Sequence, residues 1–174
     1  ILVAAWMPDG KHVAFLGSAG TDPLRGYIQG IDDGVKRQFT PEGVSVNSAS
    51  FWRLPVSPDG SRVVLIGADD NQYLFPTKGG QPEVLRGIRR GEYVVSWTDD
   101  GRALYVAAQY DSPHRVFRLD LATGRRTLWK GLHPAQTAGM RLSEISSTPD
   151  GQTFLHGYAR LLSNLYVGEG LKWQ

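Results

Sequence analysis

The chain has 174 residues, of which 41% are hydrophobic and 21% charged, a composition typical of one folded globular domain. Its 19 cationic side chains nearly balance 17 anionic ones, so nothing favours a nucleic acid or an anionic membrane as partner. The absence of cysteine excludes disulfides, thiol nucleophiles and cysteine-ligated zinc. The longest apolar run, residues 1–7, is too short to cross a bilayer, and we expect no direct membrane insertion.

One short turn sequence recurs four times. Its first copy is Trp-Met-Pro-Asp-Gly at Trp6–Gly10, and later copies end at Gly60, Gly101 and Gly151. The glycines are therefore 50, 41 and 50 residues apart, a period that predicts a repeat architecture. Proline presets φ, aspartate bonds its own backbone and glycine takes a positive φ. We interpret the four aspartates as turn residues, because a metal site would need further oxygen ligands at fixed spacing.

Short extended runs separated by turns follow one another through the chain. The first unit has predicted strands at Val3–Trp6, His12–Gly17, Tyr27–Ile31 and Val35–Thr40. The second has them at Phe51–Ser57, Arg62–Gly67, Gln72–Pro76 and Pro82–Arg86. The third has them at Tyr93–Trp97, Ala103–Gln109, Arg115–Leu121 and Arg125–Trp129. The fourth has only Leu142–Ser147, Thr153–Tyr158 and Ser163–Val167, and no stretch shows helical periodicity.

These units predict an all-β fold, a β-propeller fragment of about four blades. Each blade is a four-stranded antiparallel sheet, and the last lacks its outer strand. We place the blades of this single partial propeller at about residues 1–43, 44–91, 92–140 and 141–174. Because the chain starts on an inner strand, we expect half of a propeller. Either the remaining blades belong to a longer protein, or two copies associate as a homodimer that closes an eight-bladed ring.

The turn sequence resembles the Pro-Asp repeat of TolB-type propellers, which are also called WD-repeat-like. Trp6–Phe15 matches that motif closely, whereas Val56 and Ser147 replace its tryptophan and Asp99 replaces its proline. The stretch Leu162–Lys172 resembles the end of propellers that follow a kinase domain and a membrane helix in bacterial serine/threonine kinases. These resemblances imply a bacterial sensor or protein-binding domain, on the extracytoplasmic or periplasmic side.

A search for catalytic patterns finds none. The chain has no Gly-x-Ser-x-Gly and no phosphate loop with its lysine. Its histidines, His12, His114, His133 and His156, occupy different repeat positions and form no His-x-x-x-His pair. We therefore expect no catalytic site, no cofactor and no metal, although carboxylates paired across blades stay open because sequence does not show distance.

Candidate binding residues lie in connectors and at the starts of inner strands. The propeller scaffold fixes the position of such loops, while their sequence is free to vary. The candidate residues are Trp52, Arg53, Arg89, Arg90, Tyr93, His133, Arg141 and Arg160. We expect them to bind a protein, a peptide or a small ligand at the connector face or the channel mouth. The basic connector Gly87–Gly91 is interpreted as a solvated loop in preference to a phosphate site. Trp6 and Trp97 share one repeat position, and we interpret both as blade-packing residues.

Three functions are compatible with this repeat pattern and these motifs. The first is a non-catalytic ligand- or protein-binding module of a larger bacterial protein, such as a receptor-type serine/threonine kinase. The second is the accessory propeller of a prolyl-oligopeptidase-type peptidase, whose hydrolase domain would follow Gln174. The third is an enzyme in its own right, such as a propeller lyase or glycosidase. We favour the first because the repeat scaffold carries no catalytic constellation.

Overall fold

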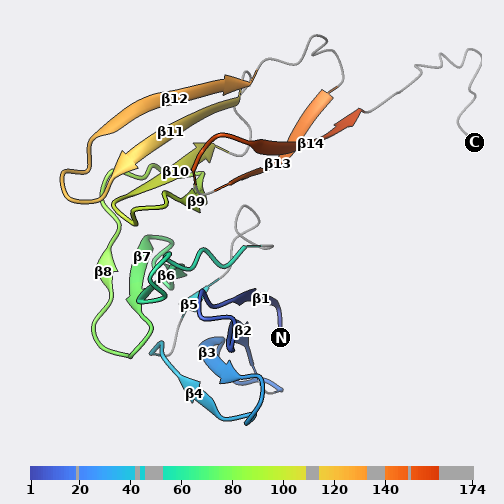
Figure 1. Ribbon diagram of the computed structural model, residues 1–174, viewed down its shortest axis with the longest axis vertical. Helices are drawn as coiled ribbons and strands as arrows, with labels where there is room; N and C mark the ends of the chain where they lie inside the picture. Colours follow the sequence, from blue (N-terminus) through green and yellow to red (C-terminus); the bar gives the residue numbers. More distant parts are fainter. Residues whose placement is uncertain are drawn as a thin grey trace, which may run out of the picture.

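The protein consists of β-sheets that follow one another along an arc (Figure 1). The computed structural model describes residues 1–18, 20–41, 44–45, 53–108, 114–132, 140–148 and 150–160, of which 45, 132 and 140–144 are described by backbone alone. All regular structure in these ranges is β-strand. Accordingly, no helix among the described residues has the length and apolar character needed to cross a membrane.

Four antiparallel sheets contain the strands in chain order. The first sheet has β1 (Val3–Trp6), β2 (His12–Gly17), β3 (Arg25–Gly30) and β4 (Lys36–Gln38). The second has β5 (Val44–Ser45), β6 (Arg62–Gly67), β7 (Gln72–Pro76) and β8 (Glu83–Val84). The third has β9 (Glu92–Trp97), β10 (Ala103–Ala108), β11 (His114–Asp120) and β12 (Arg126–Leu132), and the fourth has β13 (Met140–Ser147) and β14 (Phe154–Arg160). This arrangement is the predicted partial β-propeller.

The recurring turns join the first two strands of each sheet. Their glycines have φ between 63° and 70°, a conformation that a side chain with Cβ rarely adopts. In each turn the aspartate accepts a hydrogen bond from the amide two residues later, as in Asp59 Oδ1 with Ser61 N at 3.0 Å and Asp100 Oδ1 with Arg102 N at 3.0 Å. The prediction that these aspartates bond their own backbone is confirmed.

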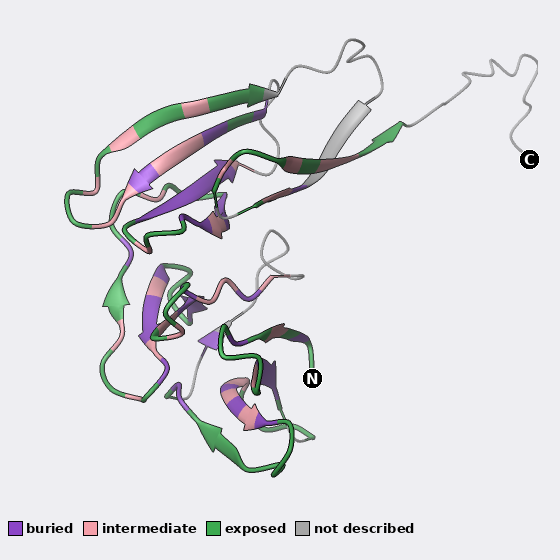
Figure 2. Ribbon diagram, viewed as in Figure 1, coloured by how far each residue is buried: buried purple, intermediate pink, exposed green. Residues whose placement is uncertain are grey.

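Apolar side chains fill the gaps between successive sheets. Val3, Leu16 and Ile28 pack against Val63 and Leu65 between the first and second sheets. The second gap contains Val64, Leu74, Trp97, Leu104 and Leu119, and the third contains Tyr93, Tyr105, Val116 and Ile145. Figure 2 shows the same layout, with exposed outer strands β4, β8 and β12 and buried strands inside. Each sheet is therefore stabilised by burying a face against its neighbour.

The first strand of the second sheet differs from its prediction. Residues 53–55 of the predicted strand Phe51–Ser57 are not in a strand, and among the described residues two separate segments pair with β6. Val44 and Ser45 pair with Gly67 and Ile66, and Val56 forms an isolated bridge to Val63. Proline at position 55 has no N–H to donate to a ladder, which disfavours a continuous strand there.

The other predicted strands agree with the structure to within three residues at each end. The exception is Ser163–Val167, which lies outside the described residues. Strand positions were predictable because each strand is bounded by a turn whose chemistry is local.

Candidate functional site

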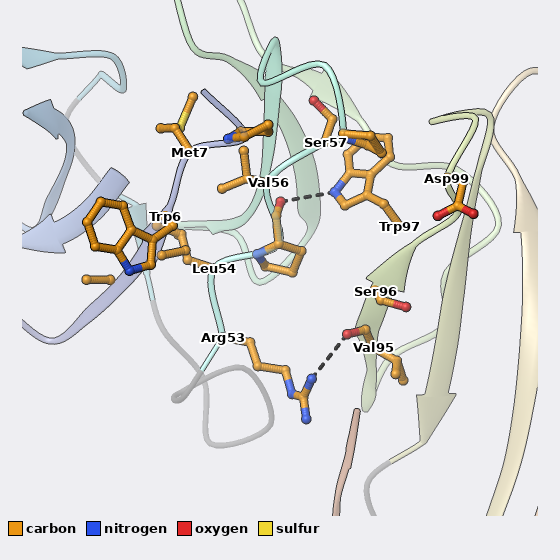
Figure 3. A pocket seen from close by; sticks show the side chains of 15 residues that line it. Trp6, Met7, Arg53, Leu54, Val56, Ser57, Val95, Ser96, Trp97 and Asp99 are labelled. Atoms are coloured by element: carbon orange, nitrogen blue, oxygen red, sulfur yellow. Dashed lines mark hydrogen bonds between the residues drawn. The ribbon is translucent and has the colours of Figure 1, made fainter. Parts of the chain in front are cut away.

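A pocket of about 630 Å³ lies where the first strands of three sheets meet (Figure 3). Its walls come from β1 and the following turn, from the segment 53–58 and from the end of β9. Most lining side chains are apolar, among them Met7, Leu54 and Val95. A volume of 300–1,000 Å³ is usual for ligand pockets, so this pocket suits a small molecule or a few residues of a peptide.

Arg53 supplies the positive charge of this pocket and joins three sheets. Its Nη1 donates to the carbonyl oxygen of Val95 at 3.2 Å, and its Nη2 donates to Ser146 Oγ at 2.8 Å. Neither acceptor is ionised, and no carboxylate pairs with Arg53 in the part of the chain that the structure describes. A guanidinium has five N–H donors, so Arg53 keeps the charge and the hydrogen-bonding capacity to hold an anionic group.

Trp6 and Trp97 occupy the same repeat position but differ in environment. Trp97 is only 4% exposed, and its Nε1 donates to the carbonyl oxygen of Pro55 at 3.1 Å. The guanidinium of Arg62 lies 5.1 Å from its ring centroid. Trp6 lines the pocket and is 64% exposed, so its interpretation as a residue packed between blades of this chain is wrong. The cause is that no described sheet covers its side of β1.

Polar groups near the pocket come from the third and fourth sheets. Ser96 Oγ lies 2.5 Å from Ser147 Oγ, a hydrogen bond that links β9 to β13. Asp99 is exposed and lines the pocket at the repeat position where the first two turns have Pro8 and Pro58. Among the described residues, the pocket therefore combines one cation, one anion and a largely apolar wall, which is the composition of a binding site.

The structure disperses the other sequence-predicted site residues. Tyr93 is only 3% exposed and packs between the third and fourth sheets, so it does not form part of an accessible rim. Arg160 is exposed at the end of β14, and Arg141 is described by its backbone alone. Trp52 and His133 lie outside the described residues. Of the predicted residues whose side chains the structure describes, Arg53 alone lines the pocket.

Arg89 and Arg90 lie in a second, more polar pocket of about 570 Å³, between the β6–β7 turn and the connector that precedes β9. Both arginines are exposed. The connector is fixed by Glu92, whose Oε2 accepts from Arg89 N at 2.7 Å. Glu92 is 6% exposed and forms a two-contact ion pair with Arg126, at 2.6 and 2.9 Å. Sequence reasoning missed this pair, whose only signal was one carboxylate in an apolar strand.

The turn carboxylates are held by hydrogen bonds within their own turns. Donation from Ser57 Oγ, and then from Ser61, lowers the pKa of Asp59 to about 2. Donation from Thr98 Oγ1 likewise lowers the pKa of Asp100, and donation from Thr148 Oγ1 lowers that of Asp150. These carboxylates are therefore ionised at neutral pH, yet their acceptor oxygens are used locally.

Among the described residues, histidines and acidic residues do not gather into a metal site. His12 Nδ1 lies 2.7 Å from Asp9 Oδ2, and His114 is buried on β11. His156 is half-buried on β14, where its ring stacks with Phe154. Over the described ranges, no three His, Cys, Asp or Glu side chains are grouped so that they could hold a metal ion.

Comparison with known proteins identifies the fold. No protein-family model and no curated protein matches this sequence. Among solved structures, TolB from Acinetobacter baumannii has a TM-score of 0.63 and 21% identity, over 89% of this chain and 37% of that one. A TolB candidate from Agrobacterium tumefaciens has a TM-score of 0.56 and 19% identity, over 91% and 57%. The oligogalacturonate lyase of Vibrio parahaemolyticus has a TM-score of 0.56 and 12% identity, over 91% and 58%.

These likenesses concern architecture. The chain adopts part of a TolB-type β-propeller fold and spans 37% to 58% of the length of these structures. The expected resemblance to TolB-type propellers is thus confirmed for the fold, while the residues that resemble a kinase-linked propeller, Leu162–Lys172, lie outside the described part. Because one fold can carry unrelated functions, function has to be argued from the site.

Proposed function

We propose that this chain is a non-catalytic binding module whose ligand is a peptide segment held in the Arg53 pocket. The observation that carries this proposal is the guanidinium of Arg53, which pairs with no carboxylate among the described residues and lies at the edge of an apolar pocket of about 630 Å³. A carboxylate of the ligand would take up the remaining donors of Arg53. An aliphatic or aromatic side chain beside that carboxylate would cover Met7 and Leu54.

The wider context of the module is a second level of the proposal. The motif at Trp6–Phe15 and the ending Leu162–Lys172 support a sensor or interaction domain of a larger bacterial protein, such as a receptor-type serine/threonine kinase. An extracytoplasmic position follows from that resemblance. The accessory propeller of a prolyl-oligopeptidase-type peptidase is the alternative, and a Gly-x-Ser-x-Gly motif farther along the parent gene would favour it.

The test is selection of ligands from a library of displayed peptides. We expect the selected peptides to share an acidic residue, or a free carboxyl terminus, next to an apolar side chain. Arg53→Gln should weaken their binding by about tenfold to a hundredfold, since a charge-assisted hydrogen bond contributes about 1.5–3 kcal/mol. Arg90→Gln is the matched control, because Arg90 is exposed in the other pocket and should not change affinity.

Two results would reject the proposed site. If Arg90→Gln weakened binding and Arg53→Gln did not, the ligand would occupy the connector. If the purified chain cleaved oligogalacturonate, the substrate named for one of its fold neighbours, the module would be an enzyme. We expect no cleavage, because the described pocket brings together Arg53, Ser96 and Asp99 without a second carboxylate or a histidine.

A further inference from the structure

The residue four positions before each turn glycine points toward the preceding sheet. In the second sheet this residue is Val56, which packs against the cluster shared with the first sheet. In the third sheet Trp97 is buried against the second, and in the fourth Ser147 bonds Ser96 of the third. In the first sheet the residue is Trp6, which no described sheet precedes and which is 64% exposed.

The residue four positions after each turn glycine points the other way, toward the following sheet. Ala14, Val64 and Tyr105 are 0%, 5% and 6% exposed, and each lies in the cluster shared with the next sheet. The fourth member of this series is Leu155, which is 74% exposed. The face that packs on a preceding sheet is therefore exposed at one end of the molecule, at Trp6. The face that packs on a following sheet is exposed at the other end, at Leu155.

We propose that these two ends bind each other between two copies of this chain. The Trp6 face (Leu2, Ala4 and Trp6) of each copy would cover the Leu155 face (Ser146 and Leu155) of the other, and the two head-to-tail contacts would close a ring of eight sheets. Leu2, Trp6 and Leu155 are among the large apolar side chains that the monomer exposes. Head-to-tail contact covers both faces, whereas a symmetric Trp6–Trp6 contact would leave Leu155 exposed.

The residues that surround Trp97, the buried equivalent of Trp6, indicate which positions of the fourth sheet would surround Trp6 in the contact. Trp97 rests on Pro55 and on the guanidinium of Arg62. The residues that occupy the positions of Pro55 and Arg62 in the fourth sheet are Ser146 and Thr153. The partner would thus offer Trp6 an apolar wall at Leu155 but no cation for its ring. The contact between copies lacks one cation–π interaction, and we expect a dimer that dissociates on dilution.

The arrangement would also complete the pocket. Trp6 forms part of its wall, at the end of the arc where no described sheet precedes it. The partner subunit's fourth sheet would close that side, while Arg53 lies on the segment 53–58 and donates to Ser146 Oγ within its own copy. Trp6 belongs to both the pocket and the contact, whereas Leu155 belongs to the contact alone, so Leu155→Asp tests assembly without changing the lining of the pocket.

The experiment is sedimentation of the 174-residue chain over a range of concentrations. The wild type should reach twice the monomer mass of 19.2 kDa. Trp6→Asp and Leu155→Asp should each weaken dimerisation by about a hundredfold or more, because both contacts in the ring lose an anchor. Val35→Asp is the matched control: Val35 is 63% exposed but lies in the β3–β4 turn, away from both faces. It should dimerise like the wild type.

A mixture of the two disruptive variants gives the sharpest result. The Trp6→Asp copy retains Leu155 and the Leu155→Asp copy retains Trp6, so one intact contact can form between them. We expect the mixture to dimerise more tightly than either variant alone, which also shows that both variants are folded. A wild type that stays monomeric would overturn the proposal and leave further sheets of a longer polypeptide as the occupant. A dimer that Leu155→Asp does not weaken would overturn it as well.

Discussion

Three of the four recurring turns carry a hydroxyl residue two positions before their aspartate. Ser57, Thr98 and Thr148 each donate to that carboxylate, and each accepts from the amide five residues later. In the first turn Met7 takes this position, and the ring of His12 bonds Asp9 instead. The hydroxyl is therefore a part of the motif that sequence reasoning overlooked, although its signal was present at the same position of three copies.

Thr98 gives a direct test of the hydroxyl's contribution. It is 7% exposed, its Oγ1 lies 2.6 Å from Asp100 Oδ1, and it accepts from Ala103 N at 3.1 Å. Thr98→Val keeps the shape but leaves a buried amide without its acceptor, so the free energy of unfolding should fall by about 1–3 kcal/mol. Urea denaturation measures the change. Thr153→Val, at an exposed threonine, is the control, and an equal loss in both variants would contradict the role of the hydroxyl.

Acid should destabilise the fold through the same turns. The pKa of Asp59 is lowered from 3.8 to about 2 in the folded chain, so its ionised form stabilises the fold above about pH 4. That stabilisation is lost as the pH falls toward 2, and the pKa values of Asp100 and Asp150 are lowered as well. The free energy of unfolding should therefore decrease as the pH is lowered from 5 to about 2.

The Asp59→Asn variant should show a smaller decrease over this range, because its side chain does not titrate. Ser57→Ala should act in the same direction, since it removes the strongest donor to Asp59. Ser18→Ala, in an exposed loop, is the control. Identical pH profiles in Asp59→Asn and the wild type would rule out this origin of acid sensitivity.

At the scale of elements, the connector between the second and third sheets depends on the buried pair of Glu92 and Arg126. Their side chains are 6% and 12% exposed, and the pair ties the start of β9 to the start of β12. Arg126→Met would leave the carboxylate of Glu92 buried without its cation. We expect the free energy of unfolding to fall by about 3–5 kcal/mol, and the amide of Arg89 to exchange faster with solvent.

A double variant separates the ion pair from packing. Adding Glu92→Gln to Arg126→Met removes the uncompensated charge and should recover part of the lost stability. Arg125→Met, at the exposed neighbouring arginine, is the control and should have little effect. If the double variant were less stable than Arg126→Met alone, the destabilisation would come from lost packing of Arg126 on Phe117, whose ring centroid lies 4.5 Å from its guanidinium carbon.

Strands were predictable where a turn defines them and less so where the chain departs from the repeat. Asp-Gly turns fix their neighbouring strands through contacts only a few residues apart, and the strands beside them begin and end close to the predicted residues. The split first strand of the second sheet was not predicted. Phe51–Ser57 has a strand-like apolar pattern. The segment that pairs with β6, Val44–Ser45, is only two residues long and is too short to show such a pattern.

At the scale of the whole molecule, the site was harder to predict than the fold. Arg53 bonds Ser146, which lies 93 positions away, and the sequence contains no sign of that contact. Tyr93 was misjudged because both faces of an inner strand are covered: Val94 packs toward the second sheet and Tyr93 and Val95 toward the fourth. Which face stays exposed depends on the neighbouring sheet, as Trp6 and Trp97 show.

The stacking of sheets along one direction also predicts how stability is distributed. Within the described residues, the fourth sheet packs its apolar side chains on the third, through Ile145 and Phe154, and its only described bond to the second sheet is that of Ser146 with Arg53, whereas Leu104 lies between the second and third. When each sheet contacts only its neighbours, a substitution in an end sheet destabilises that sheet alone, whereas a substitution in a middle interface destabilises both sheets that share it. Ile145→Ala should therefore speed amide exchange in β13 and β14 alone. Leu104→Ala should lower the free energy of opening, as measured by amide exchange, by about 3–5 kcal/mol in both middle sheets.

Hydrogen exchange followed by mass spectrometry distinguishes these outcomes. The measurement is best made in the Trp6→Asp background, where contact between copies would not add protection to the fourth sheet. Leu128→Ala, at a side chain that is 60% exposed on β12, is the control and should leave exchange unchanged. If Ile145→Ala also increased exchange in β1 and β2, the four sheets would unfold as one cooperative unit. The inter-sheet contacts would then be strong enough to transmit the loss of one buried side chain along the whole arc.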